Sequence, residues 1–131
     1  LPRYARAGDA GADLRITETV TLQPGERVLV GTGVRLALPP GTVGMLTPRS
    51  GNAARQGLGI VNSPGIIDSG YRGEIRICLI NLDATKAVEL QAGERVAQLV
   101  IVPFISAQFT PVAELDETER GQGGYGSTGQ Q

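Results

Sequence analysis

Hydrophobic and polar residues alternate with a period of two along most of this chain. The pattern is clearest over residues 16–22, 28–38, 75–82 and 96–104. In the second of these segments the valines and leucines at even positions share one face, and arginines and glycines occupy the other. The third becomes apolar on both faces from Cys78 onward. Such alternation is typical of half-buried strands, so we expect a strand in each segment.

Glycine and proline separate these segments at short intervals. Residues with turn-forming chemistry lie between the predicted strands at Pro24-Gly25, Pro39-Pro40-Gly41, Pro64-Gly65 and Ala92-Gly93. One short helix is expected near residues 52–57, with Ser50 or Asn52 available as its N-cap. Many short strands with frequent turns predict an all-β sandwich or barrel.

The length, net charge, and numbers of histidine and cysteine residues exclude several classes of functional site. The 131 residues suit one domain, and 40% apolar content is enough for a compact core. A net charge of −1 argues against a broad nucleic-acid surface, so no nucleic-acid partner is expected. The chain has no histidine, which excludes a Ser-His-Asp triad and histidine metal sites. The single cysteine, Cys78, excludes an intramolecular disulfide, and its apolar neighbours predict a buried thiol.

No apolar run is long enough to span a bilayer, so no membrane partner is expected. No secretory signal pattern is visible at the N-terminus, and we expect a cytoplasmic location. The sequence LQPGERV at 22–28 recurs as LQAGERV at 90–96, which predicts two turns of one geometry. The last residues, 116–131, are charged and then glycine-rich, typical of a frayed tail or of an arm that orders on a ligand.

Familiar nucleotide motifs fail. GQGGYG at 121–126 matches G-x-G-x-x-G, but the chain ends too soon for the strand and helix that a dinucleotide site requires. The only lysine, Lys86, stands outside any Walker pattern, which excludes a P-loop.

Four loop segments carry candidate chemistry. PRSG at 48–51 is either a surface turn or an anion site, since an arginine fork matches phosphate oxygens. NSPGIIDSGYRGEI at 62–75 suggests a β-hairpin in which Asp68 is either a turn-capping residue or a general base. DAGADL at 9–14 offers either exposed turn acids or outer-shell partners of a divalent cation. In GERVAQL at 93–99, Gln98 interrupts an apolar face and needs a polar partner or marks the edge of a site.

Taken in order along the chain, these four segments and the glycine-rich C-terminal segment resemble the five motifs of the trimeric dUTPase family. DAGADL is similar to the first motif, PRSG to the second, NSPGIIDSGYRGEI to the third, GERVAQL to the fourth and RGQGGYGSTG at 120–129 to the fifth. The resemblance covers residues 9–129, and five motifs in the right order are highly specific. It favours the ligand-ordered arm over the frayed tail.

The resemblance implies a distorted β-sandwich or jelly-roll (β-clip-like) protomer over residues 1–115, with one short helix, and a flexible glycine-rich arm over 116–131. It also implies a homotrimer with three active sites. Two protomers would form the body of each site, and the arm of the third would close it. The implied reaction is hydrolysis of dUTP to dUMP and pyrophosphate, which keeps uracil out of DNA and supplies dUMP for thymidylate synthesis.

The resemblance also assigns roles. Asp68 would activate the attacking water, with positioning help from Gln98, and Mg²⁺ would be chelated by the triphosphate and reached by Asp13 through water. Asn62 and the backbone of the 62–76 segment would read uracil, Tyr71 would exclude a 2′-hydroxyl, and Tyr125 would stack on the base. The implied substrate-binding residues are Arg49, Ser50, Gly51, Asn62, Ile66, Ile67, Asp68, Tyr71, Arg76, Arg120, Tyr125, Gly126, Ser127 and Thr128.

Two departures from the family pattern stand out. Tyr125 replaces the more usual phenylalanine and can still stack, and Asn52 follows PRSG where leucine is common. Two alternatives stay open: a dCTP deaminase-type relative, against which the complete tail motif argues, and a catalytically silent β-sandwich trimer that binds nucleotides.

Overall fold

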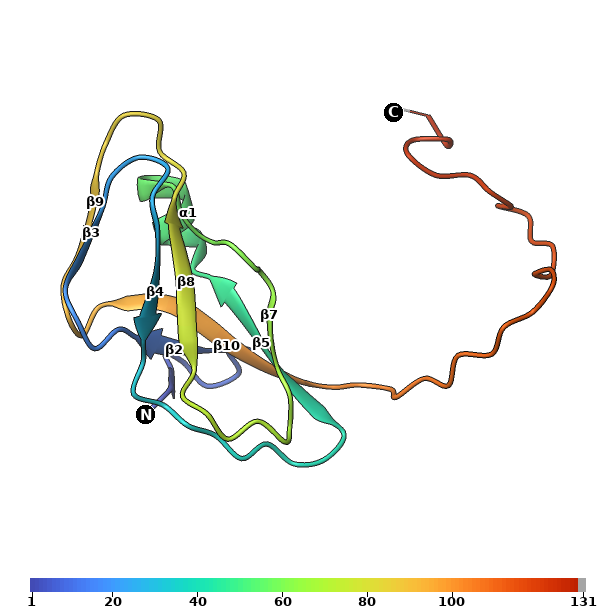
Figure 1. Ribbon diagram of the computed structural model, residues 1–131, viewed down its shortest axis with the longest axis horizontal. Coiled ribbons are helices and arrows are strands. Elements are labelled where there is room, and N and C mark those ends of the chain that lie inside the picture. Colours follow the sequence, from blue (N-terminus) through green and yellow to red (C-terminus); the bar gives the residue numbers. More distant parts are fainter. Residues whose placement is uncertain (130–131) are drawn as a thin grey trace.

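The computed structural model describes residues 1–129 and confirms an all-β fold (Figure 1). Its strands are β1 (Arg3–Tyr4), β2 (Gly11–Arg15), β3 (Val20–Leu22), β4 (Arg27–Gly31), β5 (Thr42–Pro48), β6 (Leu58–Ile60), β7 (Gly65–Ile67), β8 (Arg76–Asn81), β9 (Val88–Leu90) and β10 (Arg95–Pro103). One short helix, α1 (Ser50–Gln56), connects β5 to β6. Among residues 1–129, no helix has the length and apolarity needed to cross a bilayer.

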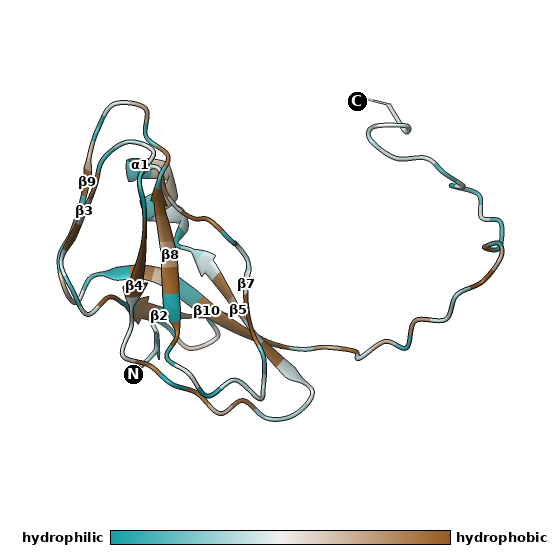
Figure 2. Ribbon diagram, viewed as in Figure 1, coloured by the Kyte–Doolittle hydropathy of each residue, from teal (hydrophilic) through white to brown (hydrophobic). Residues whose placement is uncertain are grey.

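Three antiparallel sheets build the sandwich. The largest has the order β1-β2-β10-β5-β7, a second has the order β4-β8-β6, and β3 pairs with β9. The inward faces of all three contribute to one core, to which Leu14, Val30, Leu46, Ile77 and Leu99 belong. Figure 2 shows the hydrophobic residues concentrated on these strands. Burial of alternate side chains from facing sheets is the source of stability that the period-two pattern predicted.

The two repeated turns share one geometry, as predicted. Gly25 and Gly93 both adopt left-handed backbone conformations, with φ of 81° and 91°. In each turn a glutamate accepts a hydrogen bond from the backbone N–H three residues before it: Glu26 from Gln23 at 3.0 Å and Glu94 from Gln91 at 2.9 Å. The turns follow the paired strands β3 and β9, so the sequence echo marks two matched ends of one small sheet.

Several expectations are wrong in detail. The strand predicted over residues 16–22 is shorter than expected, because β2 ends at Arg15 and β3 covers only Val20–Leu22. The second ends as a strand at Gly31, although burial still alternates over 32–38. That segment runs beside residues 72–75 through irregular bonds, such as Ile75 N–H to the Val34 carbonyl at 2.8 Å. The Cys78 thiol is half-buried rather than buried.

The predicted helix cap is also wrong. Arg49 occupies the N-cap position, and no side chain caps the helix. Asn52 instead donates from Nδ2 to the Arg95 carbonyl at 3.0 Å, which ties α1 to the start of β10. The helix ends at Gly57, whose φ of 66° is the left-handed conformation that favours glycine at this position.

The 62–75 segment is not a hairpin. Its first arm, β7, pairs with β5 in the large sheet, whereas β8 pairs with β4 and β6 in the three-stranded sheet. The segment therefore crosses from one layer of the sandwich to the other. Apolar residues on both arms misled the sequence interpretation, because burial in two different sheets gives the same pattern as burial in one.

The β8–β9 connection is fixed by two polar side chains. Buried Asn81 donates from Nδ2 to the Leu22 and Lys86 carbonyls, both at 2.9 Å, and accepts from the Asp83 N–H. Asp83 accepts backbone N–H bonds from Thr85 and Lys86, and these bonds hold the pKa of its carboxyl below the ordinary value.

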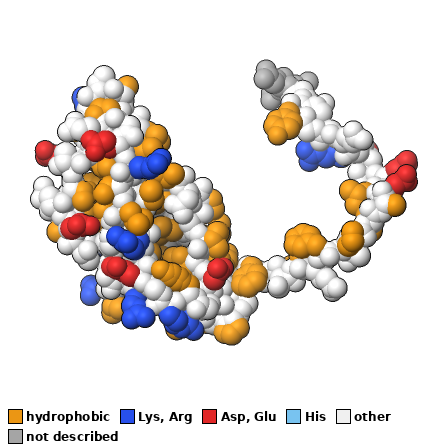
Figure 3. Space-filling model, viewed as in Figure 1, with side chains coloured by type: hydrophobic (Ala, Val, Ile, Leu, Met, Phe, Trp, Pro, Cys, Tyr) orange, Lys and Arg blue, Asp and Glu red, His pale blue; other side chains and the backbone are white. Residues whose placement is uncertain are grey.

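Regular structure ends at Pro103, before the boundary expected at residue 115. Residues 104–129 contain no helix or strand and run away from the sandwich (Figure 1). We refer to residues 104–129 as the arm. Several of its large hydrophobic side chains, including Ile105, Phe109 and Leu115, are more than four-fifths exposed (Figure 3).

Candidate active site

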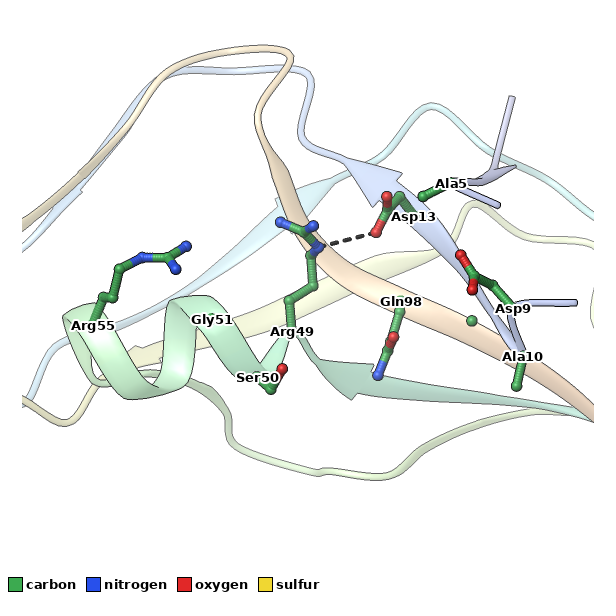
Figure 4. A pocket seen from close by; sticks show the side chains of 10 residues that line it. Ala5, Asp9, Ala10, Asp13, Arg49, Ser50, Gly51, Arg55 and Gln98 are labelled. Atoms are coloured by element: carbon green, nitrogen blue, oxygen red, sulfur yellow. Dashed lines mark ion pairs between the residues drawn. The ribbon is translucent and has the colours of Figure 1, made fainter. Parts of the chain in front are cut away.

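Residues from four of the five motifs line two separate cavities. The first, which we call the arginine cavity, has a volume of about 520 Å³. Figure 4 shows its lining side chains, which come from the loop before β2, from β2, from the β5–α1 junction, from α1 and from β10. Its lining residues are Ala5, Asp9, Ala10, Gly11, Asp13, Arg49, Ser50, Gly51, Arg55 and Gln98.

Strand order explains why three motifs converge here. Strand β10 lies between β2 and β5, and Gln98 is opposite Asp13 on one side and Thr47 on the other. Arg49 and Ser50 follow directly where β5 gives way to α1. Segments distant in sequence therefore become neighbours in the large sheet, and side chains from all three face one cavity.

Asp13 forms ion pairs with two arginines. Arg49 Nε lies 3.0 Å from Asp13 Oδ1, and Arg95 Nη1 lies 3.2 Å from Asp13 Oδ2 (the Arg49 pair is dashed in Figure 4). The Asp13 side chain is only 14% exposed. Charge-assisted bonds of this kind orient all three groups, so the Arg49 guanidinium is held at the cavity edge.

Arg55 and Arg95 were absent from the predicted site. Arg55 lines the arginine cavity, and its guanidinium lies over Gly51: a Cβ added at Gly51 would be 2.9 Å from Nη2. The spacing of four residues from Gly51 to Arg55 places both on one helical face, which was a usable signal. Arg95 had no comparable signal, because its importance comes only from the contact with Asp13.

Gln98 has the polar partner that the sequence required. Its Nε2 donates to the Pro48 carbonyl at 3.4 Å, and the side chain is half-buried. Its amide lies against the backbone of Gly11, where an added Cβ would be 2.5 Å from Oε1. The absence of a side chain at Gly11 therefore leaves room for this amide.

The second cavity, which we call the tyrosine cavity, is smaller and more apolar, at about 310 Å³. It brings together five predicted residues: Asn62, Ile66, Ile67, Tyr71 and Arg76. The other lining residues are Leu29, Leu46, Gly65, Glu74 and Ile75. An apolar cavity with a few polar groups at its edge suits a planar heterocycle and a sugar.

Asp68 lines neither cavity in the chain taken alone. It is exposed and follows β7 directly, and its backbone carbonyl accepts a bond from the Tyr71 N–H at 3.1 Å. This bond closes the turn that carries the tyrosine, so the Asp68 backbone, and not its side chain, caps the turn. The Asp68 carboxylate makes no hydrogen bond or ion pair within residues 1–129.

The predicted residues of the arm also lie apart from both cavities. Arg120 Nε donates to the Gly123 carbonyl at 2.8 Å, within the arm itself. Tyr125 is fully exposed with a φ of 48°. Gly126, Ser127 and Thr128 continue this part of the arm, and none of the five lines either cavity. One chain thus holds every predicted element but does not join them.

Comparisons with known proteins identify the family of this chain. A sequence model of the dUTPase family matches residues 1–129. The chain is 64% identical over 129 residues to the deoxyuridine 5′-triphosphate nucleotidohydrolase of Cutibacterium acnes, covering 98% of this chain and 85% of that protein. It is 57% identical to the enzyme of the same name from Corynebacterium diphtheriae, with the same coverage.

Solved structures show the same fold. The dUTPase of Staphylococcus bacteriophage 80alpha with dUpNHpp superposes with a TM-score of 0.91 at 33% identity, covering 98% of this chain and 91% of that one. A mutant dUTPase from phage phi11 of S. aureus, described with a structural Mg(II) ion, has a TM-score of 0.80 at 31% identity, covering 89% of this chain and 92% of that one. The family match, the identities and the fold agree, and the chain belongs to the dUTPase family.

Proposed function

We propose that this dUTPase hydrolyses dUTP to dUMP and pyrophosphate by Mg²⁺-dependent attack of water on the α-phosphate. The observation that carries the proposal is that the two cavities differ in chemistry: one is lined by arginines and a serine, and the other is mainly apolar. The arginine cavity offers guanidinium and hydroxyl donors that match phosphate oxygens. The tyrosine cavity offers an apolar slot with amide and backbone groups that suits a pyrimidine nucleoside. Such a reaction would supply dUMP and keep dUTP from being used in DNA synthesis.

We propose that the site is assembled in a homotrimer. Each site would take the arginine cavity from one subunit, the tyrosine cavity with Asp68 from a second, and the arm from a third. The separation of these parts in a single chain supports this arrangement. So do the exposed hydrophobic side chains of the arm, because large apolar surface in water favours burial against another chain.

Each residue has a defined part in this reaction. Arg49, Ser50 and Gly51 bind phosphate oxygens, joined by Arg120, Gly126, Ser127 and Thr128 when the arm closes. Asp68 accepts the proton of the attacking water, and Gln98 positions that water. A positioned general base is worth about 10²–10⁴ in rate.

The residues present suit a metal ion that arrives with the substrate. Within residues 1–129 no group of three or more acidic, cysteine or histidine side chains could cage a metal. Both oxygens of Asp13 already contact arginines, so a water-mediated contact, which keeps the ion pairs, suits this carboxylate better than direct coordination. When bound, Mg²⁺ supplies charge neutralisation on the triphosphate.

Selection of the nucleoside follows from the tyrosine cavity. The backbone of β7 and Asn62 would pair with the uracil edge beside Ile66, Ile67 and Arg76. A cytosine amino group would leave a buried polar partner unmet, at a cost of about 1–3 kcal/mol. Tyr71 would pack against the deoxyribose and exclude a 2′-hydroxyl, and Tyr125 would cover the base from the arm.

The first test is pyrophosphate release from dUTP, dCTP, dTTP and UTP in the presence of Mg²⁺. We expect rapid release from dUTP alone. Ammonia release from dCTP would indicate a deaminase instead, and binding of dUTP without turnover would indicate a silent trimer.

The second test is the variant Asp68→Asn. It should bind dUTP with nearly unchanged affinity and lose about 10²–10⁴ in kcat, because the amide cannot take the proton. Asp116→Asn, which changes an exposed carboxylate of the arm, is the matched control and should keep full activity. Unchanged kcat in Asp68→Asn would remove the role of general base from this residue.

A further inference from the structure

Gly73 lies two residues after Tyr71 in the turn between β7 and β8. The tyrosine ring folds back over its backbone. A Cβ added at Gly73 would be 2.5 Å from Tyr71 Cζ and 2.7 Å from Cε1, and it would also clash with the hydroxyl. These distances are too short for any real side chain, so the ring can occupy its present place only because residue 73 has no side chain.

The other end of this contact is fixed. The Tyr71 hydroxyl donates to the Glu74 carbonyl at 2.9 Å. Glu74 is held in turn, because its Oε1 accepts from the Gly33 N–H at 2.8 Å. The next residue, Ile75, donates from its N–H to the Val34 carbonyl at 2.8 Å, and its carbonyl accepts from buried Thr32.

The backbone at Gly73 does not itself require glycine. Gly73 is not among the residues with φ in the left-handed region, so the strain that favours glycine there does not apply at this position. The backbone of the turn is anchored by several bonds, whereas one hydroxyl bond holds the ring, which can rotate about its side-chain bonds. A methyl group at this position therefore moves the ring, with loss of that bond, rather than the chain. The ring lines the tyrosine cavity, and its displacement changes the shape of that cavity.

We propose that Gly73 is a positioning residue: by leaving space under the Tyr71 ring, it sets how closely the ring packs against the sugar and thereby sets the preference for deoxyribose over ribose. This inference rests on the proposed function, in which the tyrosine cavity binds the nucleoside.

The test compares kcat/KM for dUTP and UTP in Gly73→Ala. We expect the dUTP-to-UTP ratio to fall about tenfold or more. A pocket discriminates against one added hydroxyl by only about 10²-fold in total, so displacement of the ring should remove a large part of that preference. A general loss of structure would lower both values together and leave the ratio unchanged. An unchanged ratio in a folded variant would overturn the proposal.

Gly70→Ala is the matched control. A Cβ at Gly70 meets no atom within 4 Å, its φ is outside the left-handed region, and it lines neither cavity. It should keep the wild-type ratio. A fall in the ratio equal to that of Gly73→Ala would overturn the proposal, because loop stiffness rather than contact with the ring would then be the cause.

Two further measurements isolate the contact. In a Tyr71→Ala background, Gly73→Ala should change the ratio no further, and any additional fall would show that Gly73 acts independently of Tyr71. If Gly73→Ala alone does not fold, the Tyr71→Ala/Gly73→Ala double variant should fold, because the clash is gone. Failure of both to fold would overturn the proposal.

Calorimetric affinities for dUMP and UMP separate this inference from the proposed function. A wild-type protein that releases no pyrophosphate contradicts the proposed reaction. If it still prefers dUMP over UMP and loses that preference in Gly73→Ala, the positioning role stands. If wild type and Gly73→Ala show the same preference, the positioning role fails whatever the outcome for catalysis.

Discussion

At the scale of single residues, three glycines leave space that a neighbouring polar side chain occupies. Gly11 accommodates the Gln98 amide, Gly51 accommodates the Arg55 guanidinium and Gly73 accommodates the Tyr71 ring. In each case a Cβ would meet the functional end of a polar side chain at 2.9 Å or less. The positions of the polar groups around both cavities therefore depend on neighbours that have no side chain.

Gly11→Ala should lower kcat for dUTP about 100-fold, since a displacement of about 1 Å of a catalytic group can cost that much. The added Cβ would push the Gln98 amide away from its present place beside Pro48. Steady-state kinetics check this, with Gly70→Ala as the control. A variant with wild-type kcat would show that the amide tolerates displacement.

Sequence patterns found residue types better than they found contacts. Five of the residues predicted to bind the nucleoside line one cavity: Asn62, Ile66, Ile67, Tyr71 and Arg76. Asp68 and the arm lie outside it. The roles of Arg95 and Gly11 were not predicted, because both depend on which residues of β2 and β10 become neighbours in the folded sheet. Strand register is a property of the folded sheet, and alternation alone does not give it.

At the scale of elements, strand β10 is the central organiser. It pairs with β2 along one edge and with β5 along the other, and it leads directly into the arm. Alternation predicted this strand and β8 closely. It overextended the strand that ends at Gly31, because residues 32–38 keep alternate burial while their hydrogen bonds go to the 72–75 turn rather than to a regular ladder.

Thr32→Val should destabilise the fold by about 1–3 kcal/mol. The Thr32 hydroxyl is buried, donates to the Ile75 carbonyl at 2.7 Å and accepts from the Val34 N–H at 3.2 Å, and valine matches its shape without either bond. Urea denaturation measures the loss.

Thr21→Val, at an exposed position of β3, is the control for Thr32→Val and should change the free energy of unfolding by less than about 0.5 kcal/mol. Equal losses in the two variants would show that the intrinsic exchange, and not the buried hydroxyl, is responsible.

At the scale of the whole molecule, the defining feature is separation. The arginine cavity, the tyrosine cavity and the arm lie in different parts of one chain. The sequence motifs indicated their presence. In the homotrimer that we propose, they meet only across a second and a third copy. Geometry between copies leaves little trace in the alternation of a single chain, and in the sequence only the resemblance to a trimeric family indicated it.

Mixed assemblies test this arrangement. Chains carrying Asp68→Asn and chains lacking residues 120–131 should each be nearly inactive alone. Co-refolded in equal amounts, they should recover about one quarter of wild-type turnover, because that share of sites would draw Asp68 and the arm from two different intact donors. If both elements came from the same subunit, the mixture would remain inactive.

The arm has a consequence for how long the enzyme survives. Arg120 is the only basic residue after Arg95, and it is exposed in a segment without strands or helices. A trypsin-like protease therefore finds a single cleavable bond in the arm, after Arg120, and cutting there removes Tyr125 together with the glycine-rich end. If the arm closes over bound nucleotide, as we propose, then substrate shields this bond. The persistence of active enzyme would in that case follow the supply of dUTP.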